Sequence, residues 1–252
     1  MKNEFASFLL AVQFLTRVPI RSGDIYTSDR MAASVRYYPL VGALVGGLSA
    51  SGFYLASLLF PVLISVLIAI VVGLLVTGAF HEDGLADTFD GVGGGHTRDK
   101  ALSIMKDSRL GTYGTLALVT MLLLKFAALA ALPLAVIPMV LIAGHGLSRL
   151  SSVLVIATSR YVRDEGTGKP VATGMSATSL SVAVASGALV FALFCVWLPT
   201  IGALCAIAGL GIAHALMRLF FEHKLGGYTG DTLGAVQQAS EIGFYLGLVA
   251  WL

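Results

Sequence analysis

The sequence predicts an all-α, polytopic integral membrane protein with about seven transmembrane helices and one N-terminal interfacial helix. Of its 252 residues, 57% are hydrophobic and only 12% are charged, which is too little polar side-chain area to cover a soluble globule of this size. The apolar residues occur in stretches of about 20, the length that crosses the hydrocarbon core of a bilayer. Lysine and arginine collect between these stretches, as in the cytoplasmic loops of membrane proteins.

Proline and charged residues divide the chain into six or seven apolar stretches. Pro61, Pro133 and Pro199 each stand where a new helix would begin after a tight turn, a position at which no backbone N–H is needed. The expected helices therefore come as hairpins. Their ranges are 37–60, 61–80, 112–132, 133–157, 178–198, 199–219 and 232–252.

The N-terminal segment, 1–36, is expected to be interfacial or cytoplasmic, and its first 20 residues are expected to lie on the membrane rather than to cross it. Phe5 and Phe8 belong to an apolar stripe, whereas Gln13 and Arg17 interrupt the other side of the same helix. This pattern favours an interfacial helix over an eighth span. The segment lacks a small-residue cleavage site, so it does not resemble a removed signal peptide.

The positions of lysine and arginine predict the orientation. They are concentrated in the polar segments and are absent from the turns at Pro61, Pro133 and Pro199. The positive-inside rule therefore places the polar segments in the cytoplasm. We expect a multi-pass protein of the bacterial inner membrane. Lys125 is the exception, since it lies within a span and is expected to extend outward to the interface.

The whole chain, 1–252, is expected to form a single membrane-embedded domain, in which 81–111 and 220–235 are cytoplasmic catalytic loops. Nucleic acid is not an expected partner, because the net charge is only +2 and no basic run interleaved with aromatic residues occurs. Cys195 and Cys205 lie in apolar stretches without metal-ligand spacing, so neither a disulfide nor a zinc site is expected.

The strongest candidate for a site is an acidic cluster at the end of the second stretch. If the helix continues through it, 3.6 residues per turn places Asp83, Asp87 and Asp90 within an arc of about 60°. Like charges at these spacings repel one another, and no basic residue stands between them. Hard divalent cations such as Mg²⁺ prefer such oxygen ligands. We therefore expect Mg²⁺ to be held by Asp83, Asp87, Asp90 and Glu82, the alternative being a solvated acidic helix end.

Glycines and basic residues after this cluster are candidates for binding phosphate. The run from Gly91 to Gly95 contains Gly93 and Gly94, whose N–H groups could approach an anion closely, although glycine runs also serve as flexible connectors. No Walker A ending is present. The basic candidates are Arg98, Lys106 and Arg109.

Two further regions carry candidate residues. In the last polar loop, Gly227 and Gly230 are expected to bind phosphate, and Asp231 is a further carboxylate unless it only caps the final helix. In the fourth stretch, Arg149 stands four residues after His145 and so shares its helix face. A buried guanidinium near a carboxylate site suits phosphate, so Arg149 is a candidate catalytic residue. His214 and Arg218 repeat this spacing, although Arg218 could extend to the interface.

Three ordered motifs give the chain a specific resemblance. The pattern Asp-Gly-x-Ala-Asp-x-x-Asp-Gly falls on 83–91, Met-Lys-Asp-Ser-Arg-x-Gly on 105–111, and Gly-Gly-x-Thr-Gly-Asp-x-x-Gly-Ala on 226–235. With Phe14–Pro19 and Tyr38–Gly42, these motifs resemble the adenosylcobinamide-GDP ribazoletransferases, also called cobalamin 5′-phosphate synthases. The resemblance runs along most of the chain.

The resemblance implies a Mg²⁺-dependent membrane enzyme that transfers the cobinamide-phosphate moiety of adenosylcobinamide-GDP to α-ribazole or α-ribazole 5′-phosphate and releases GMP. In this interpretation Asp83, Asp87 and Asp90 hold Mg²⁺ on the diphosphate, and Asp231 completes the metal site or accepts the hydroxyl proton. Membrane lipids are expected partners, and a homo-oligomer or a complex with other enzymes of the pathway stays open.

Two other classes of protein remain as alternatives. A phosphotransferase of the CDP-alcohol type also places aspartates at a cytoplasmic helix end, but its Asp-Gly-x-x-Ala-Arg signature is absent. A small-molecule transporter is suggested by the intramembrane residues His145, Arg149 and Glu241. Transporters usually bind substrate near the bilayer midplane, however, whereas the carboxylates here gather at one interface.

Overall fold

The computed structural model describes residues 2–21, 23–163, 169–172 and 175–252, and these residues are almost entirely helical or in short connections. Tyr161 and Tyr228 form an isolated parallel β-bridge. The helices are α1 (Lys2–Leu15), α2 (Ser28–Ser34), η1 (Val35–Tyr37), α3 (Tyr38–Ser57), α4 (Val62–Thr77), α5 (Phe80–Gly94), α6 (Arg98–Ile104), α7 (Thr112–Ala130), α8 (Ile137–Thr158), α9 (Lys169–Ala172), α10 (Ala177–Cys195), α11 (Thr200–Leu225) and α12 (Gly230–Trp251).

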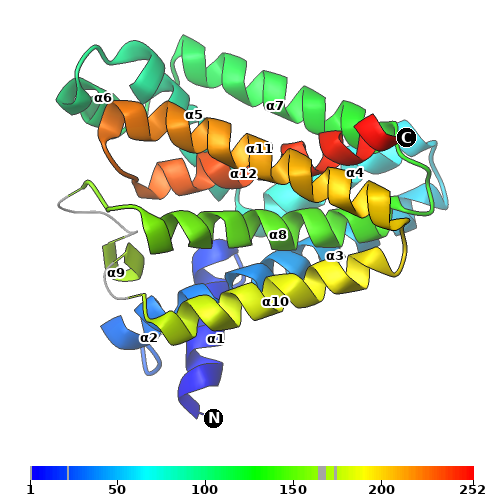
Figure 1. The fold of residues 1–252 in the computed structure, drawn as a ribbon, viewed down its shortest axis with the longest axis horizontal. Coiled ribbons are helices and arrows are strands. Elements are labelled where there is room, and N and C mark those ends of the chain that lie inside the picture. The colour runs from blue at the N-terminus through cyan, green and yellow to red at the C-terminus, as the bar shows by residue number, and fades with distance from the viewer. Residues whose placement is uncertain (1, 22, 164–168, 173–174) are drawn as a thin grey trace.

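The long helices form a bundle, in which α3, α7, α8, α10 and α11 run side by side (Figure 1). Among the described residues, five helical segments are long and apolar enough to cross a membrane. The prediction of an all-α polytopic membrane protein is therefore confirmed. These segments are Ser28–Ser57, Thr112–Ala130, Ile137–Thr158, Ala177–Cys195 and Thr200–Leu225.

The count of spans differs from the seven expected. The predicted second span, 61–80, corresponds to α4, which has only 16 residues. The chain then bends by 87° into α5, so the two helices together add at most a sixth span. Helix α12 occupies the predicted range 232–252 but is not among the five segments in the described structure. Its polar residues Gln237, Gln238 and Glu241 are buried against neighbouring helices rather than exposed to lipid. Because α5 carries four acidic residues and turns away from α4, we treat it as lying outside the spans.

The bend between α4 and α5 has a local cause. Gly78 ends α4 with a φ of 66°, and Ala79 follows with a φ of 55°, so both lie in the left-handed region where a helix stops. A side chain at Gly78 would collide with that of Arg17, whose backbone N–H donates to the Val76 carbonyl at 2.8 Å. Arg17, which follows α1 directly, therefore fixes the bend between α4 and α5.

The N-terminal helix α1 has 14 residues, which is shorter than a span requires, and it lies crosswise to the bundle (Figure 1). Its Glu4 carboxylate pairs with Arg36 at 2.9 Å and accepts the Tyr37 hydroxyl at 2.6 Å. These contacts hold α1 against the start of the first span. They agree with an interfacial helix and not with an eighth span.

Candidate active site

The predicted acidic cluster lies on α5, beginning just after the bend. Along this helix Asp83 is exposed, Asp87 is partly buried and Asp90 is buried. The three aspartates are therefore helical, as expected, but on a helix that is separate from the preceding span. The segment 81–111 is largely helical rather than a loop, because α5 and α6 fill most of it.

Helix α12 crosses α5 closely because each helix places a glycine against the other's backbone. A Cβ atom at Gly84 would lie 2.7 Å from the Asp231 carbonyl oxygen, and one at Gly234 would lie 2.9 Å from that of His81. Only glycine permits such an approach. The crossing brings Asp231 close enough to Asp83 and Asp87 for their charges to interact.

The Asp231 carboxylate is not the cap of α12. Thr229 is the N-cap residue, and it forms a capping box with Thr232 through reciprocal hydrogen bonds. Asp231 instead pairs with Arg163, whose Nη2 lies 2.7 Å from Oδ2. Arg163 was not among the residues predicted for the site. It reaches Asp231 because the Tyr161–Tyr228 bridge fastens its segment to the loop before α12.

The surroundings of the site disfavour the ionised form of its carboxylates when no further cation is bound. Burial, together with the charges of Asp231 and Asp83, raises the pKa of Asp87 to about 7, although Arg163 acts in the opposite direction. Burial also raises the pKa of Asp231, which Arg163 partly offsets. One arginine therefore faces three interacting carboxylates, which leaves this face of α5 and α12 suited to a further cation.

Asp90 has different surroundings from Asp83 and Asp87. Its Oδ2 accepts the Gly111 N–H at 2.7 Å, and its Oδ1 accepts the Gly114 N–H at 2.8 Å. Each oxygen thus holds one N–H at the start of α7, where helical N–H groups lack partners of their own. The structure gives Asp90 the task of fastening α7 to α5.

Glu82 points into the bundle, away from the aspartates. Its Oε1 accepts a hydrogen bond from Gln238 at 2.9 Å, and the side chain is only 8% exposed. Across the described part of the chain, no three His, Cys, Asp or Glu side chains are placed to hold one metal ion. The four expected carboxylate ligands, Asp83, Asp87, Asp90 and Glu82, therefore do not converge on one point.

The site nevertheless fits Mg²⁺ in the form in which enzymes commonly use it. Mg²⁺ keeps several waters and is usually held by one or two carboxylates together with the phosphates of the substrate. Asp87 supplies such a carboxylate, with the exposed Asp83 beside it, and the repulsion that these two share with Asp231 favours a cation. The donor set thus suits a hydrated ion arriving with a phosphorylated substrate, not a preformed protein cage.

The candidate phosphate-binding residues are in varied environments. Gly93 and Gly94 lie within α5, where each N–H bonds to the carbonyl four residues before it, so they form no open N–H cradle. The Arg98 side chain donates to the carbonyl oxygen of Leu225 at 2.9 Å and so links α6 to α11. Lys106 and Arg109 are exposed, and Arg109 pairs with Asp107 at 2.6 Å.

Gly227 and Gly230, the two candidate glycines of the last polar loop, differ from each other. An added Cβ at Gly227 would collide with the Arg160 carbonyl oxygen, so this glycine serves the packing of the loop. Around Gly230 nothing lies within 4 Å of such an atom. Gly230 is the first residue of α12, where free N–H groups attract anions.

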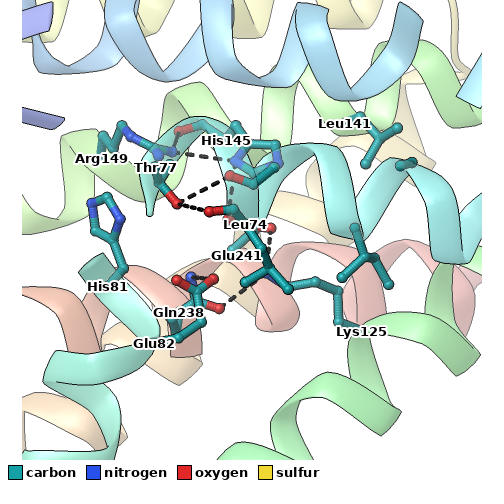
Figure 2. Close-up of a pocket in the computed structure, with 13 residues that line it drawn as sticks. Leu74, Thr77, His81, Glu82, Lys125, Leu141, His145, Arg149, Gln238 and Glu241 are labelled. Atoms are coloured by element: carbon teal, nitrogen blue, oxygen red, sulfur yellow. Dashed lines mark hydrogen bonds and ion pairs between the residues drawn. The ribbon is translucent and has the colours of Figure 1, made fainter. Parts of the chain in front are cut away.

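Arg149 belongs to a buried polar cluster between α5, α7, α8 and α12 (Figure 2). The centre of the cluster is Glu241, whose Oε1 lies 3.0 Å from Lys125 Nζ and whose Oε2 lies 3.4 Å from His145 Nδ1. Arg149 donates to the His145 carbonyl oxygen at 2.9 Å. The expectation that Lys125 extends outward was wrong, because its ammonium group turns inward to a carboxylate on another helix.

The second His-x-x-x-Arg pair has no comparable role. Arg218 lies 3.1 Å from Glu222, one turn further along α11, and donates to the Thr158 hydroxyl at 2.7 Å. The sequence identifies Arg149 and Arg218 as candidates, because each lies within a predicted span four residues after a histidine. Only the structure separates the buried Arg149 from the partly exposed Arg218.

Comparisons with known proteins agree along the full chain. The sequence profile described as cobalamin-5-phosphate synthase matches residues 7–249. The adenosylcobinamide-GDP ribazoletransferase of Shewanella frigidimarina (strain NCIMB 400) is 45% identical over 249 residues, covering 96% of this chain and 94% of that relative. The protein of the same name from Shewanella amazonensis (strain ATCC BAA-1098 / SB2B) is 42% identical over 254 residues, covering 98% and 96%. No solved structure matches the chain.

Proposed function

The chain belongs to the family of cobalamin-5-phosphate synthases, and from this premise we infer that it joins adenosylcobinamide-GDP to α-ribazole or α-ribazole 5′-phosphate with release of GMP. It is a membrane transferase of cobalamin biosynthesis. The family match favours this activity over a CDP-alcohol phosphotransferase or a transporter.

The reaction is a substitution at phosphorus. A ribose hydroxyl of the acceptor forms a new P–O bond to the phosphate that carries the corrinoid, the P–O bond to GMP breaks, and the hydroxyl proton passes to a base. The protein must therefore position the hydroxyl in line, offset the charge of the diphosphate and hold a proton acceptor.

The observation that carries the proposal is the crossing of α5 and α12, which brings Asp83, Asp87 and Asp231 together at one edge of the bundle. We assign Asp87, with Asp83 beside it, to Mg²⁺ on the diphosphate. When bound there, Mg²⁺ supplies charge neutralisation for the diphosphate and the leaving GMP. Asp90 supports this arrangement by fastening α7 rather than as a direct ligand.

Asp231 is assigned as the acceptor of the hydroxyl proton. Its raised pKa brings the carboxylate closer to the range in which a general base works at neutral pH. Arg163 holds the carboxylate in place through the 2.7 Å ion pair. We assign the exposed side chains of Lys106 and Arg109 to contacts with the phosphates of the substrate and of GMP.

The site is assigned to the cytoplasmic face of the inner membrane. Helices α5 and α6 and the start of α12 lie at one end of the bundle, and the turns between α3 and α4, α7 and α8, and α10 and α11 lie at the other (Figure 1). Those turns contain no lysine or arginine, which is typical of the side opposite the cytoplasm. Lipids surround the bundle, where many leucine side chains are exposed.

The purified protein in liposomes tests the proposal. Supplied with adenosylcobinamide-GDP, α-ribazole 5′-phosphate and Mg²⁺, it should release GMP and form the joined corrinoid in equal amounts. Excess EDTA should stop both, and added Mg²⁺ should restore them. Turnover that continues unchanged in EDTA would contradict the magnesium assignment, and folded protein without turnover would contradict the activity.

A further inference from the structure

A second pocket adjoins the acidic site. It is a cavity of about 50 Å³ whose polar lining comes from Tyr38, His81, Arg149, Ser152, Gly230 and Asp231. Apolar side chains of the N-terminal segment and the start of α5, including Phe14 and Phe80, close its remaining walls. Asp231 lines this cavity and also interacts with the aspartates of α5, so the two sites share one residue.

The Arg149 guanidinium in this pocket has unused binding capacity. The residue is only 1% exposed, and its Nη1 donates to the His145 carbonyl, but its Nε has no hydrogen-bond partner. Among the described residues no carboxylate lies within ion-pair distance of it, and Glu241 and Glu82 act on it only from further away. A buried, partly unsatisfied guanidinium is costly, so its presence points to an anionic ligand.

Two further groups make the same pocket suitable for an anion. The hydroxyl of Tyr38 lies near Ser34 yet has no hydrogen-bond partner in the described structure. The first turn of α12 also lines the pocket, and its capping box satisfies the N–H of Thr232 but not that of Gly230 or Asp231. Helix N-termini with free N–H groups attract phosphate and carboxylate groups.

The size of the cavity limits what enters it. A cavity that binds benzene has a volume of roughly 150 Å³. A cavity of about 50 Å³ is much smaller, so it suits one small terminal group rather than an aromatic base. The reacting diphosphate is also unsuited, because in-line substitution needs space on both sides of the phosphorus. A terminal phosphate monoester fits the size, the charge and the donors.

We propose that the Arg149 pocket binds the phosphate of the acceptor that does not react, the one retained in a cobalamin 5-phosphate product. This inference rests on the proposed function. With that phosphate held by Arg149, Tyr38 and the first turn of α12, the ribose of the acceptor extends past Asp231 toward the aspartates of α5. The pocket then makes the enzyme prefer a phosphorylated ribazole over the free nucleoside.

The test compares the two acceptors in the full-length protein in liposomes. In the wild type, kcat/KM is measured with α-ribazole 5′-phosphate and with α-ribazole, and their ratio gives the preference. Arg149→Gln should lower this preference by about 10- to 100-fold, the range expected when a charged hydrogen bond is lost. Tyr38→Phe should lower it less, and Arg149→Lys, which keeps the charge, should restore part of it.

Arg218→Gln is the matched control, because Arg218 has the same spacing from a histidine but pairs with Glu222 outside the pocket. It should leave the preference unchanged. An equal fall with both acceptors in Arg149→Gln would overturn the proposal and give Arg149 a purely structural role. Absence of GMP release with either acceptor in the wild type would instead overturn the proposed function.

A second measurement does not depend on the folding of a variant. Ribose 5-phosphate should inhibit the wild-type enzyme in competition with α-ribazole 5′-phosphate, whereas ribose should not. Competition with adenosylcobinamide-GDP would place the bound phosphate in the donor site and overturn the proposal. Absence of inhibition would overturn it as well.

Discussion

At the residue scale, Asp87 and Asp90 stand three positions apart on α5 yet have different partners. Asp90 is satisfied by two backbone N–H groups, whereas burial, together with the charges of Asp231 and Asp83, raises the pKa of Asp87 to about 7. A residue held by two N–H donors stabilises a helix junction, and a carboxylate opposed by like charges is suited to a cation. Although both residues belong to one motif, Asp90 therefore fastens α7 to α5, and Asp87 is suited to a bound cation.

Asp90→Asn should destabilise the protein. An amide has one acceptor oxygen in place of two, so the N–H of Gly111 or Gly114 loses its partner, at a cost of about 1–3 kcal/mol. Thermal unfolding in detergent micelles should show a lower Tm. Asp99→Asn is the control, because that side chain is 93% exposed. A wild-type Tm for Asp90→Asn would show that Asp90 does not fasten α7.

At the element scale, the position of the active site depends on how closely α5 and α12 cross. Gly84 and Gly234 set that distance, because any side chain at either position would meet the backbone of the opposite helix. The crossing decides whether Asp231 reaches the aspartates of α5. It also decides the width of the pocket that contains Arg149, which the start of α12 lines.

Gly84→Val should abolish GMP release while the protein still inserts into the membrane, because the added side chain forces α12 away from α5. Gly94→Ala on the same helix is the matched control, since the nearest atom to its added Cβ would be 3.6 Å away. The rate of GMP release tests the activity of both variants, and membrane fractionation tests their insertion. Full activity in Gly84→Val would mean that the close crossing is unnecessary for the site.

The sequence allowed most helices and the acidic motif to be predicted, because apolar length and the 3.6-residue period are local properties. It did not predict the bend after Gly78, which depends on Arg17 from a distant segment. Nor did it predict the pairing of Arg163 with Asp231 or the inward turn of Lys125. Those contacts join side chains far apart in the chain, and the period of a single helix carries no information about them.

At the scale of the whole molecule, the bundle buries charged groups that a bilayer would not tolerate singly. Lys125 on α7 and Glu241 on α12 are 5% and 0% exposed, and they pair at 3.0 Å. Isolated, each would be costly in the membrane, but together they are neutral and join two helices. This pair explains how α12, a helix with several buried polar side chains, is held within the bundle.

Lys125→Met and Glu241→Gln should each destabilise the bundle by about 3–5 kcal/mol, because each removes the opposite charge that lies 3.0 Å from its buried partner. The double variant should lose clearly less free energy of unfolding than the sum of the losses in the two single variants. Unfolding in mixed detergent micelles gives the three free energies of unfolding. Strictly additive losses would show that the two residues do not stabilise the protein as a pair.

The most direct test of the central claim is the initial rate of GMP release by Asp87→Asn, compared with the wild type in liposomes at saturating Mg²⁺. The account predicts a rate lower by about 100-fold or more, as expected when a group that acts on transition-state charge is removed, with the Tm of the folded protein retained. A variant that releases GMP at close to the wild-type rate would contradict the assignment of Asp87, and with it the active site at the crossing of α5 and α12.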